Sequence, residues 1–232
     1  MDVYKKRRTI IIVLLTVLFS FIIVTNSPNQ VETATPTKIE KTQNISDSAK
    51  SVLNKLVIKN RTSNDDYIRE KFGSGWVNNK GCDTRNIILN RDLIDAKIDD
   101  KCNVISGILN DPYTGKIINF TRGTNTSDDI QIDHVVALSN AWQTGAERLS
   151  NQQRIDLAND PLELLAVDGS ANQQKSDGDA SVWLPLNKSF RCQYIARQIA
   201  VKQKYSLWVT SDEFNTMTNI LDKCPNQLLP SP

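Results

Sequence analysis

The sequence lacks any cysteine pair in the Cys-x-x-Cys spacing that thiol-based zinc sites use, so we do not expect a zinc site of that kind. Its four cysteines stand far apart, at positions 82, 102, 192 and 224. An even number of cysteines in an exported chain indicates two disulfides, for which three pairings are possible. We expect Cys82–Cys102 and Cys192–Cys224, because each bond closes a local loop and would stabilise the fold by roughly 2–4 kcal/mol.

The sequence also lacks a strong net charge. The formal charge is +2, and removal of residues 1–28 takes away four basic residues and one acid, which leaves 24 basic and 25 acidic residues. A whole-protein positive field is therefore excluded as the source of nucleic-acid affinity. Binding of nucleic acid would instead require a local basic groove and a metal ion on the protein.

The N-terminus has neither a small-x-small cleavage motif nor a lipobox cysteine, although it carries an export signal. Lys5, Lys6, Arg7 and Arg8 precede a nearly unbroken apolar run over 9–24. The length of this run leaves a cleaved signal peptide and an uncleaved membrane anchor both open. We expect the protein to be secreted, or tethered to the extracellular face of the plasma membrane by this segment.

The remaining chain predicts a polar linker and one folded domain, with no internal repeat. Residues 29–48 have little apolar content and predict a disordered linker, and residues 49–232 form the domain. Apolar periodicity predicts an α+β fold that is mainly helical. We expect helices beginning near Ala49, ending near Arg91, and covering 138–145, 150–159 and 191–204, a short helix within 65–77, and a hairpin within 103–118 whose turn is Asp111–Lys116.

Chemistry is suggested by the segment around the single histidine of the chain. Taken alone, one histidine is more often structural than catalytic. However, alternation over 129–133 predicts a strand that ends in Asp133-His134, and an apolar run over 162–167 predicts a second strand. A capped helix start then carries Asn172 and Lys175. Strand, insertion, strand and helix together are the layout of a ββα-metal finger.

These residues resemble a known family. The segments DHVVAL, NDPLELLAV, SANQQKSD and WLP, with CDTRNIIL, CNVISG and DPYTGK upstream, are similar to the secreted bacterial HNH endonuclease family proteins, which are relatives of the C-terminal domain of GmrSD restriction enzymes in the His-Me finger superfamily. The resemblance covers roughly residues 80–224. The Asp-His pair with a downstream Asn-x-x-Lys also resembles the HNH domain of CRISPR effectors.

The chemistry of phosphodiester hydrolysis gives each residue a role. A neutral imidazole can deprotonate water, so His134 is the expected general base. The hard oxygens of Asp133 and Asn172 would bind Mg²⁺, with Mn²⁺ as the alternative. Lys175, one turn after Asn172, would stabilise developing charge. Each residue also has a structural interpretation, in which Asp133 and Asn172 cap local structure and Lys175 is a solvated surface residue.

Glu163 departs from the resembled family, which usually has an asparagine at this position to steady the loop that bears the histidine. Glu163 would replace it by accepting a hydrogen bond, orient His134 directly, or mark weakened activity. Arg85 and Lys116 are candidate phosphate contacts, and surface placement is their alternative. Tyr113 and Gly115 are expected to serve the turn.

The sequence therefore favours an exported, metal-dependent endonuclease that cuts DNA, with RNA as a further candidate substrate. The alternative is a catalytically impaired surface protein that binds nucleic acid or cell wall on an HNH scaffold. A toxin delivered to competitors is a third hypothesis.

Overall fold

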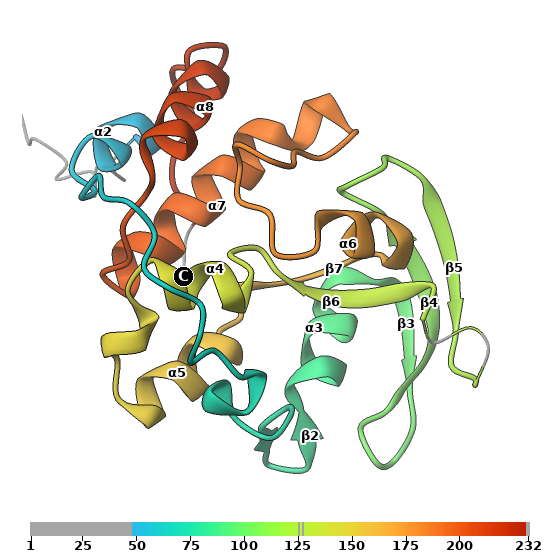
Figure 1. Ribbon diagram of the computed structural model, residues 1–232. Coiled ribbons are helices and arrows are strands. Elements are labelled where there is room, and N and C mark those ends of the chain that lie inside the picture. Colours follow the sequence, from blue (N-terminus) through green and yellow to red (C-terminus); the bar gives the residue numbers. More distant parts are fainter. Residues whose placement is uncertain (1–47, 125, 127, 231–232) are drawn as a thin grey trace, which may run out of the picture. The chain divides into compact units, whose positions relative to one another are not determined.

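The computed structural model describes residues 48–124, 126 and 128–230 (Figure 1). The expected export segment, and all but residue 48 of the expected linker, lie outside this range. Within it, the helices are α2 (Ala49–Leu53), η1 (Arg69–Phe72), α3 (Thr84–Asp92), α4 (Leu138–Gln143), η2 (Ala146–Arg148), α5 (Asn151–Ala158), α6 (Gly169–Lys175), η3 (Lys188–Phe190), α7 (Arg191–Lys204) and α8 (Ser211–Leu221). The strands are β1 (Asn78–Asn79), β2 (Cys82–Asp83), β3 (Ile94–Ile98), β4 (Val104–Asn110), β5 (Ile117–Thr121), β6 (Ile130–His134) and β7 (Leu164–Asp168).

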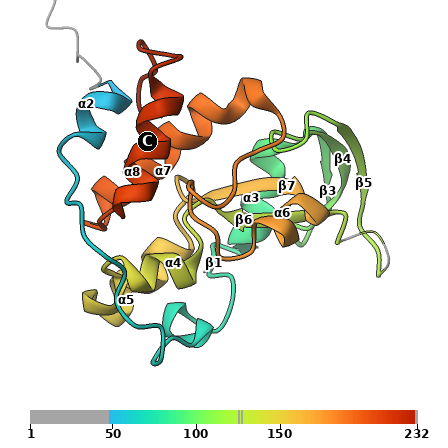
Figure 2. The same ribbon diagram turned by 45° about the horizontal axis from the view of Figure 1, so that its top comes forward.

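The expected α+β class is confirmed, with three small antiparallel sheets. β1 pairs with β2, β3 and β5 flank β4, and β6 pairs with β7. Helices α3 and α6 lie on either side of the β6–β7 ribbon, whereas α4 and α5 fill the connection between its two strands (Figure 1). Helices α2, α7 and α8 contact one another away from that ribbon (Figure 2).

Local capping explains several helix boundaries. Ser150 begins α5 with a capping box that it shares with Gln153, and Ser48 caps α2. The expected hairpin is confirmed as β4 and β5, joined through Gly115 at φ 77°. The expected helix within 65–77 is only the single turn η1, because Gly73 at φ 101° ends it and no side chain caps its start.

Two separate apolar clusters hold these elements together. One includes Leu53 of α2, Ile195 of α7 and Leu221 of α8, and the other includes Ile88 of α3, Phe120 of β5 and Leu164 of β7. The β6–β7 ribbon contributes to both clusters, through Val167 to the first and Ile132 to the second. Its position is therefore fixed by apolar burial on both faces.

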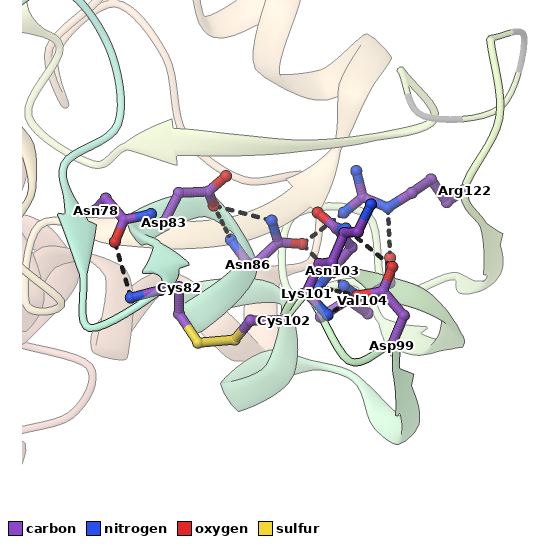
Figure 3. The surroundings of a disulfide bond; sticks show 11 residues. Asn78, Cys82, Asp83, Asn86, Asp99, Lys101, Cys102, Asn103, Val104 and Arg122 are labelled. Atoms are coloured by element: carbon purple, nitrogen blue, oxygen red, sulfur yellow. Dashed lines mark hydrogen bonds between the residues drawn. A yellow bond between two sulfur atoms is a disulfide. The ribbon is translucent and has the colours of Figure 1, made fainter.

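Both expected disulfides are confirmed. Cys82–Cys102 connects β2 to the loop between β3 and β4, next to the start of α3 (Figure 3). In the same region Asp83 caps α3, and the Asn86 side chain accepts a hydrogen bond from the Val104 amide at 2.9 Å (Figure 3). Cys192–Cys224 ties the start of α7 to the chain that follows α8. Among the described residues, no helix is long and apolar enough to cross a membrane.

Candidate active site

The candidate site is built on β6, β7 and α6. Asp133 pairs with Leu165 and His134 with Leu164, so both side chains belong to the last two positions of β6. Asp168 ends β7, and its carboxylate accepts a hydrogen bond from the Ala171 amide at 2.8 Å, which starts α6 directly beside the sheet. Asp133, His134 and Asn172 consequently line one pocket of about 500 Å³.

His134 is held in one orientation by two contacts. Its Nε2 lies 2.9 Å from the backbone carbonyl of Ala158, the last residue of α5. Helix C-termini leave such carbonyls without intrahelical partners. A carbonyl can only accept, so Nε2 carries the proton and Nδ1 keeps the lone pair. The indole of Trp76 stacks on the imidazole, with ring centroids 5.7 Å apart and planes 11° apart.

Burial sets the protonation state of this ring. His134 is 7% exposed, and desolvation lowers its pKa to about 3. The hydrogen bond to Ala158 opposes this effect, and the positive charges of Arg69 and Lys175 add to it. The imidazole is therefore neutral at physiological pH, with its lone pair on Nδ1.

We expect His134 to remain neutral, with its proton on Nε2, at pH 5, well below the ordinary histidine pKa of about 6.5. The chain has one histidine, so a ¹⁵N NMR spectrum of histidine-labelled protein reports this ring alone. Nδ1 should resonate as an unprotonated nitrogen and Nε2 as a protonated one. An imidazolium spectrum at pH 5, or the opposite tautomer, would contradict the arrangement.

Asp133 is buried between two donors. The Tyr113 hydroxyl donates to Oδ2, and the Lys175 ammonium donates to Oδ1 at 2.9 Å and to the His134 carbonyl at 2.8 Å. Burial raises the pKa of Asp133, whereas Lys175 and Tyr113 lower it by stabilising the carboxylate. Tyr113 therefore contacts the site as well as forming part of the turn, and its turn is fixed by Asp111, which also accepts the Asp168 amide.

Lys175 does not face the pocket that contains Asp133, His134 and Asn172. Its side chain has no exposed surface, and it is not among the residues that line the pocket. Its ammonium contacts Asp133 and the backbone of His134 instead. The arrangement suits a residue that positions the end of β6.

The oxygen donors of the pocket fit a hard divalent cation. One oxygen of Asp133 accepts from Tyr113 and the other from Lys175, and a carboxylate has about four lone-pair sites in all. The Asn172 side-chain amide donates to Gln131 Oε1 at 2.9 Å, and no described residue donates a hydrogen bond to the Asn172 side-chain oxygen. No group of three or more His, Cys, Asp or Glu side chains suited to a metal occurs among the described residues. Two protein oxygens supplemented by water suit Mg²⁺.

Glu163 supports the backbone just after His134. Its carbonyl accepts the Val135 amide at 2.9 Å, and its Oε2 accepts the Val136 amide at 3.2 Å. The side chain is fully buried, and desolvation holds its pKa well above the ordinary value, which favours the neutral acid over the carboxylate. Like an asparagine, a neutral carboxylic acid offers one oxygen acceptor and one donor group.

The two expected phosphate contacts separate in space. Arg85 lines the pocket, and its guanidinium donates to the Ile130 carbonyl at 3.1 Å. Lys116 lies exposed in the β4–β5 turn and does not line that pocket. The structure therefore brings Arg85, but not Lys116, to the histidine.

Sequence reasoning missed Tyr113, Trp76 and Arg69. Arg69 and Trp76 flank a glycine-rich turn and line the pocket from a segment that precedes His134 by about sixty residues. No periodic pattern connects them to β6. The Asp-Pro-Tyr-Thr-Gly turn gave a sequence signal for Tyr113 alone. A tyrosine that is buried usually needs a hydrogen-bond partner for its hydroxyl, which is a reason to look for a nearby polar group.

Comparison with known proteins adds independent findings. The pattern of the C-terminal domain of GmrSD restriction endonucleases matches residues 83–220, a range that includes Asp133, His134 and Asn172. An uncharacterized secreted protein of the fungus Arthroderma benhamiae is 36% identical over 196 residues, covering 82% of this chain and 93% of that protein. Because this relative is fungal, the expectation that the resembled family is bacterial is not supported. No solved structure matches.

Proposed function

Because the chain belongs to the family of the C-terminal domain of GmrSD restriction endonucleases, we propose that it is a metal-dependent endonuclease hydrolysing phosphodiester bonds of DNA, with RNA as a further substrate to test. The observation that supports this proposal most strongly is the meeting of Asp133, His134 and Asn172 in one pocket. We assign the β6–β7–α6 unit to the HNH finger on the same basis.

His134 is the general base of the proposed reaction. Its neutral ring, with Nε2–H bonded to Ala158, presents Nδ1 as the proton acceptor. A water molecule beside Nδ1 transfers its proton there as its oxygen attacks phosphorus, and the bond to the 3′ oxygen breaks. The carbonyl of Ala158 then stabilises the imidazolium through the same hydrogen bond.

Asp133 and the side-chain oxygen of Asn172 are the residues that would hold Mg²⁺ or Mn²⁺. When bound, the ion supplies Lewis-acid stabilisation of charge on the phosphate and the leaving oxygen. Asn172 is kept in place by Gln131, and Asp133 by Tyr113 and Lys175. Their geometry is therefore set before any substrate arrives.

Lys175 and Glu163 act as positioning residues in this proposal. Lys175 joins the Asp133 carboxylate to the His134 carbonyl, so that one ammonium fixes both residues at the end of β6. Glu163 fixes the two amides that follow. In its protonated form, Glu163 offers the same acceptor and donor groups as the family asparagine.

We further propose that the protein acts outside the cell. The support is the apolar N-terminal run, the two disulfides and the secreted fungal relative. Cleavage of the N-terminal segment would release the enzyme, and retention would tether it to the membrane.

The proposal is tested by incubating the purified full-length chain with supercoiled plasmid in Mg²⁺, Mn²⁺ or EDTA. We expect nicking and linearisation with either metal. We expect no cutting in EDTA, because without the metal ion no Lewis acid stabilises the charge on the leaving oxygen. Intact plasmid across several divalent cations would refute the nuclease activity. Retained DNA binding in that case would favour the catalytically impaired binding protein. Cutting that persists in EDTA would refute the metal requirement.

A further inference from the structure

Two cavities meet at His134, and one cation lines both. The larger, of about 500 Å³, contains Asp133 and Asn172, and the smaller, of about 150 Å³, is formed by η1, the turn after it and Ala158. The cavities share four lining residues, which are Arg69, Trp76, His134 and Leu138. Among the described charged side chains, Arg69 alone lines both cavities. Glu70 lines only the smaller one, and Arg85, Asp133 and Asp177 line only the larger one.

Arg69 is exposed but belongs to an anchored segment. Phe72, three residues later, is buried, and the buried Arg154 of α5 donates to the Lys71 carbonyl at 3.0 Å. The neighbouring Trp76 stacks on the imidazole. The backbone that carries Arg69 is therefore fixed against both α5 and the histidine, and Arg69 lines both cavities.

Among the described residues, no carboxylate neutralises the positive charge of Arg69 by direct contact. Over the described ranges, no ion pair within 4 Å joins Arg69 to an acidic side chain. Arg69 lines both cavities together with His134. An anion bound beside His134 would be attracted by the positive charge of Arg69.

We propose that Arg69 is a substrate-binding residue that holds a backbone phosphate of the nucleic-acid strand beside His134. A planar guanidinium can donate two parallel hydrogen bonds to a phosphate, which fixes its orientation as well as its position. Arg85 lines the larger cavity from α3 and would contact a neighbouring phosphate. Two cations of the near-neutral chain would thus lie along the path of the strand. This inference rests on the proposed function for the identity of the ligand.

Binding of a fluorescent DNA oligonucleotide to the full-length chain in EDTA tests the inference without cleavage. At about 0.1 M salt we expect Arg69→Ala to weaken binding about tenfold, because a charge-assisted hydrogen bond to phosphate is lost. The slope of log affinity against log salt should fall by about 0.9, the release of counterions from one phosphate. Arg69→Lys should restore the slope and only part of the affinity.

The matched control is Lys97→Ala, an exposed cation of β3 that lines neither cavity, which should bind like the wild type. Unchanged affinity and slope for Arg69→Ala would overturn the inference, as would an equal loss for Lys97→Ala. If Arg69→Ala binds weakly while the wild type never cuts, the nuclease proposal fails and this one stands. If the wild type cuts in a metal-dependent way and Arg69→Ala binds like the wild type, the nuclease proposal stands and the inference about Arg69 fails. A wild-type chain that neither binds nor cuts DNA refutes both.

Discussion

Replacing His134 with alanine is expected to slow DNA cleavage about 10²- to 10⁴-fold, the range that general-base catalysis contributes. His134 is the only histidine, so no second imidazole can substitute for it. The measurement is the single-turnover nicking rate of supercoiled plasmid in Mg²⁺ at saturating enzyme. Because the loss is in the chemical step, DNA affinity measured in EDTA should remain close to that of the wild type.

The control for this experiment is His134→Gln, which keeps a side-chain amide able to donate to the Ala158 carbonyl. We expect it to unfold at a denaturant concentration near that of the wild type and yet to cleave as slowly as His134→Ala. Cleavage by either variant at the wild-type rate would eliminate His134 as the base.

The second large effect is expected on stability. Lys175→Met leaves the Asp133 carboxylate buried without its cation, and breaking such a pair typically costs about 3–5 kcal/mol. The Lys175 side chain has no exposed surface and lies 2.9 Å from the carboxylate. Equilibrium urea unfolding, followed by tryptophan fluorescence, should show a midpoint far below that of the wild type.

Lys202→Met provides the matched comparison, because Lys202 is equally buried and lies 3.0 Å from the buried Glu213 in the α7–α8 region. We expect a comparable loss of stability from it, with cleavage per folded molecule unchanged. Lys175→Met should lower cleavage per folded molecule as well, since it releases both Asp133 and the His134 carbonyl. Equal activity per folded molecule in the two variants would argue against positioning by Lys175.

Much of the fold was predictable because its signals are local. The alternation before Asp133, the apolar run before Asp168 and the Ser150 cap each lie within one segment, and they correspond to β6, β7 and α5. Helix α7 matches the expected range 191–204. Strand β3 was not predicted. Apolar and polar residues alternate over its five positions, but four of the five are exposed, so no buried face marks it.

The site was less predictable because its supporting contacts are not local. Asp133 and His134 lie on β6, and Asn172 lies on the helix that directly follows the partner strand β7, so a short stretch of local structure is enough for all three to line one pocket. The positions of Lys175 and Trp76 depend on packing instead. A lysine one turn after Asn172 can face solvent or the sheet, and only burial against Asp133 selects the second. Nothing near Trp76 in the sequence indicates that it stacks on a ring 58 positions later.

The bond from His134 to the carbonyl at the end of α5 limits how this site could be transferred to another scaffold. A graft of the two strands and α6 would carry the acidic, amide and lysine groups but would omit α5 and leave the imidazole free to rotate. It would also leave behind the turn that supplies Tyr113 and the segment that supplies Trp76. A unit that keeps all of these contacts therefore spans residues 69–175.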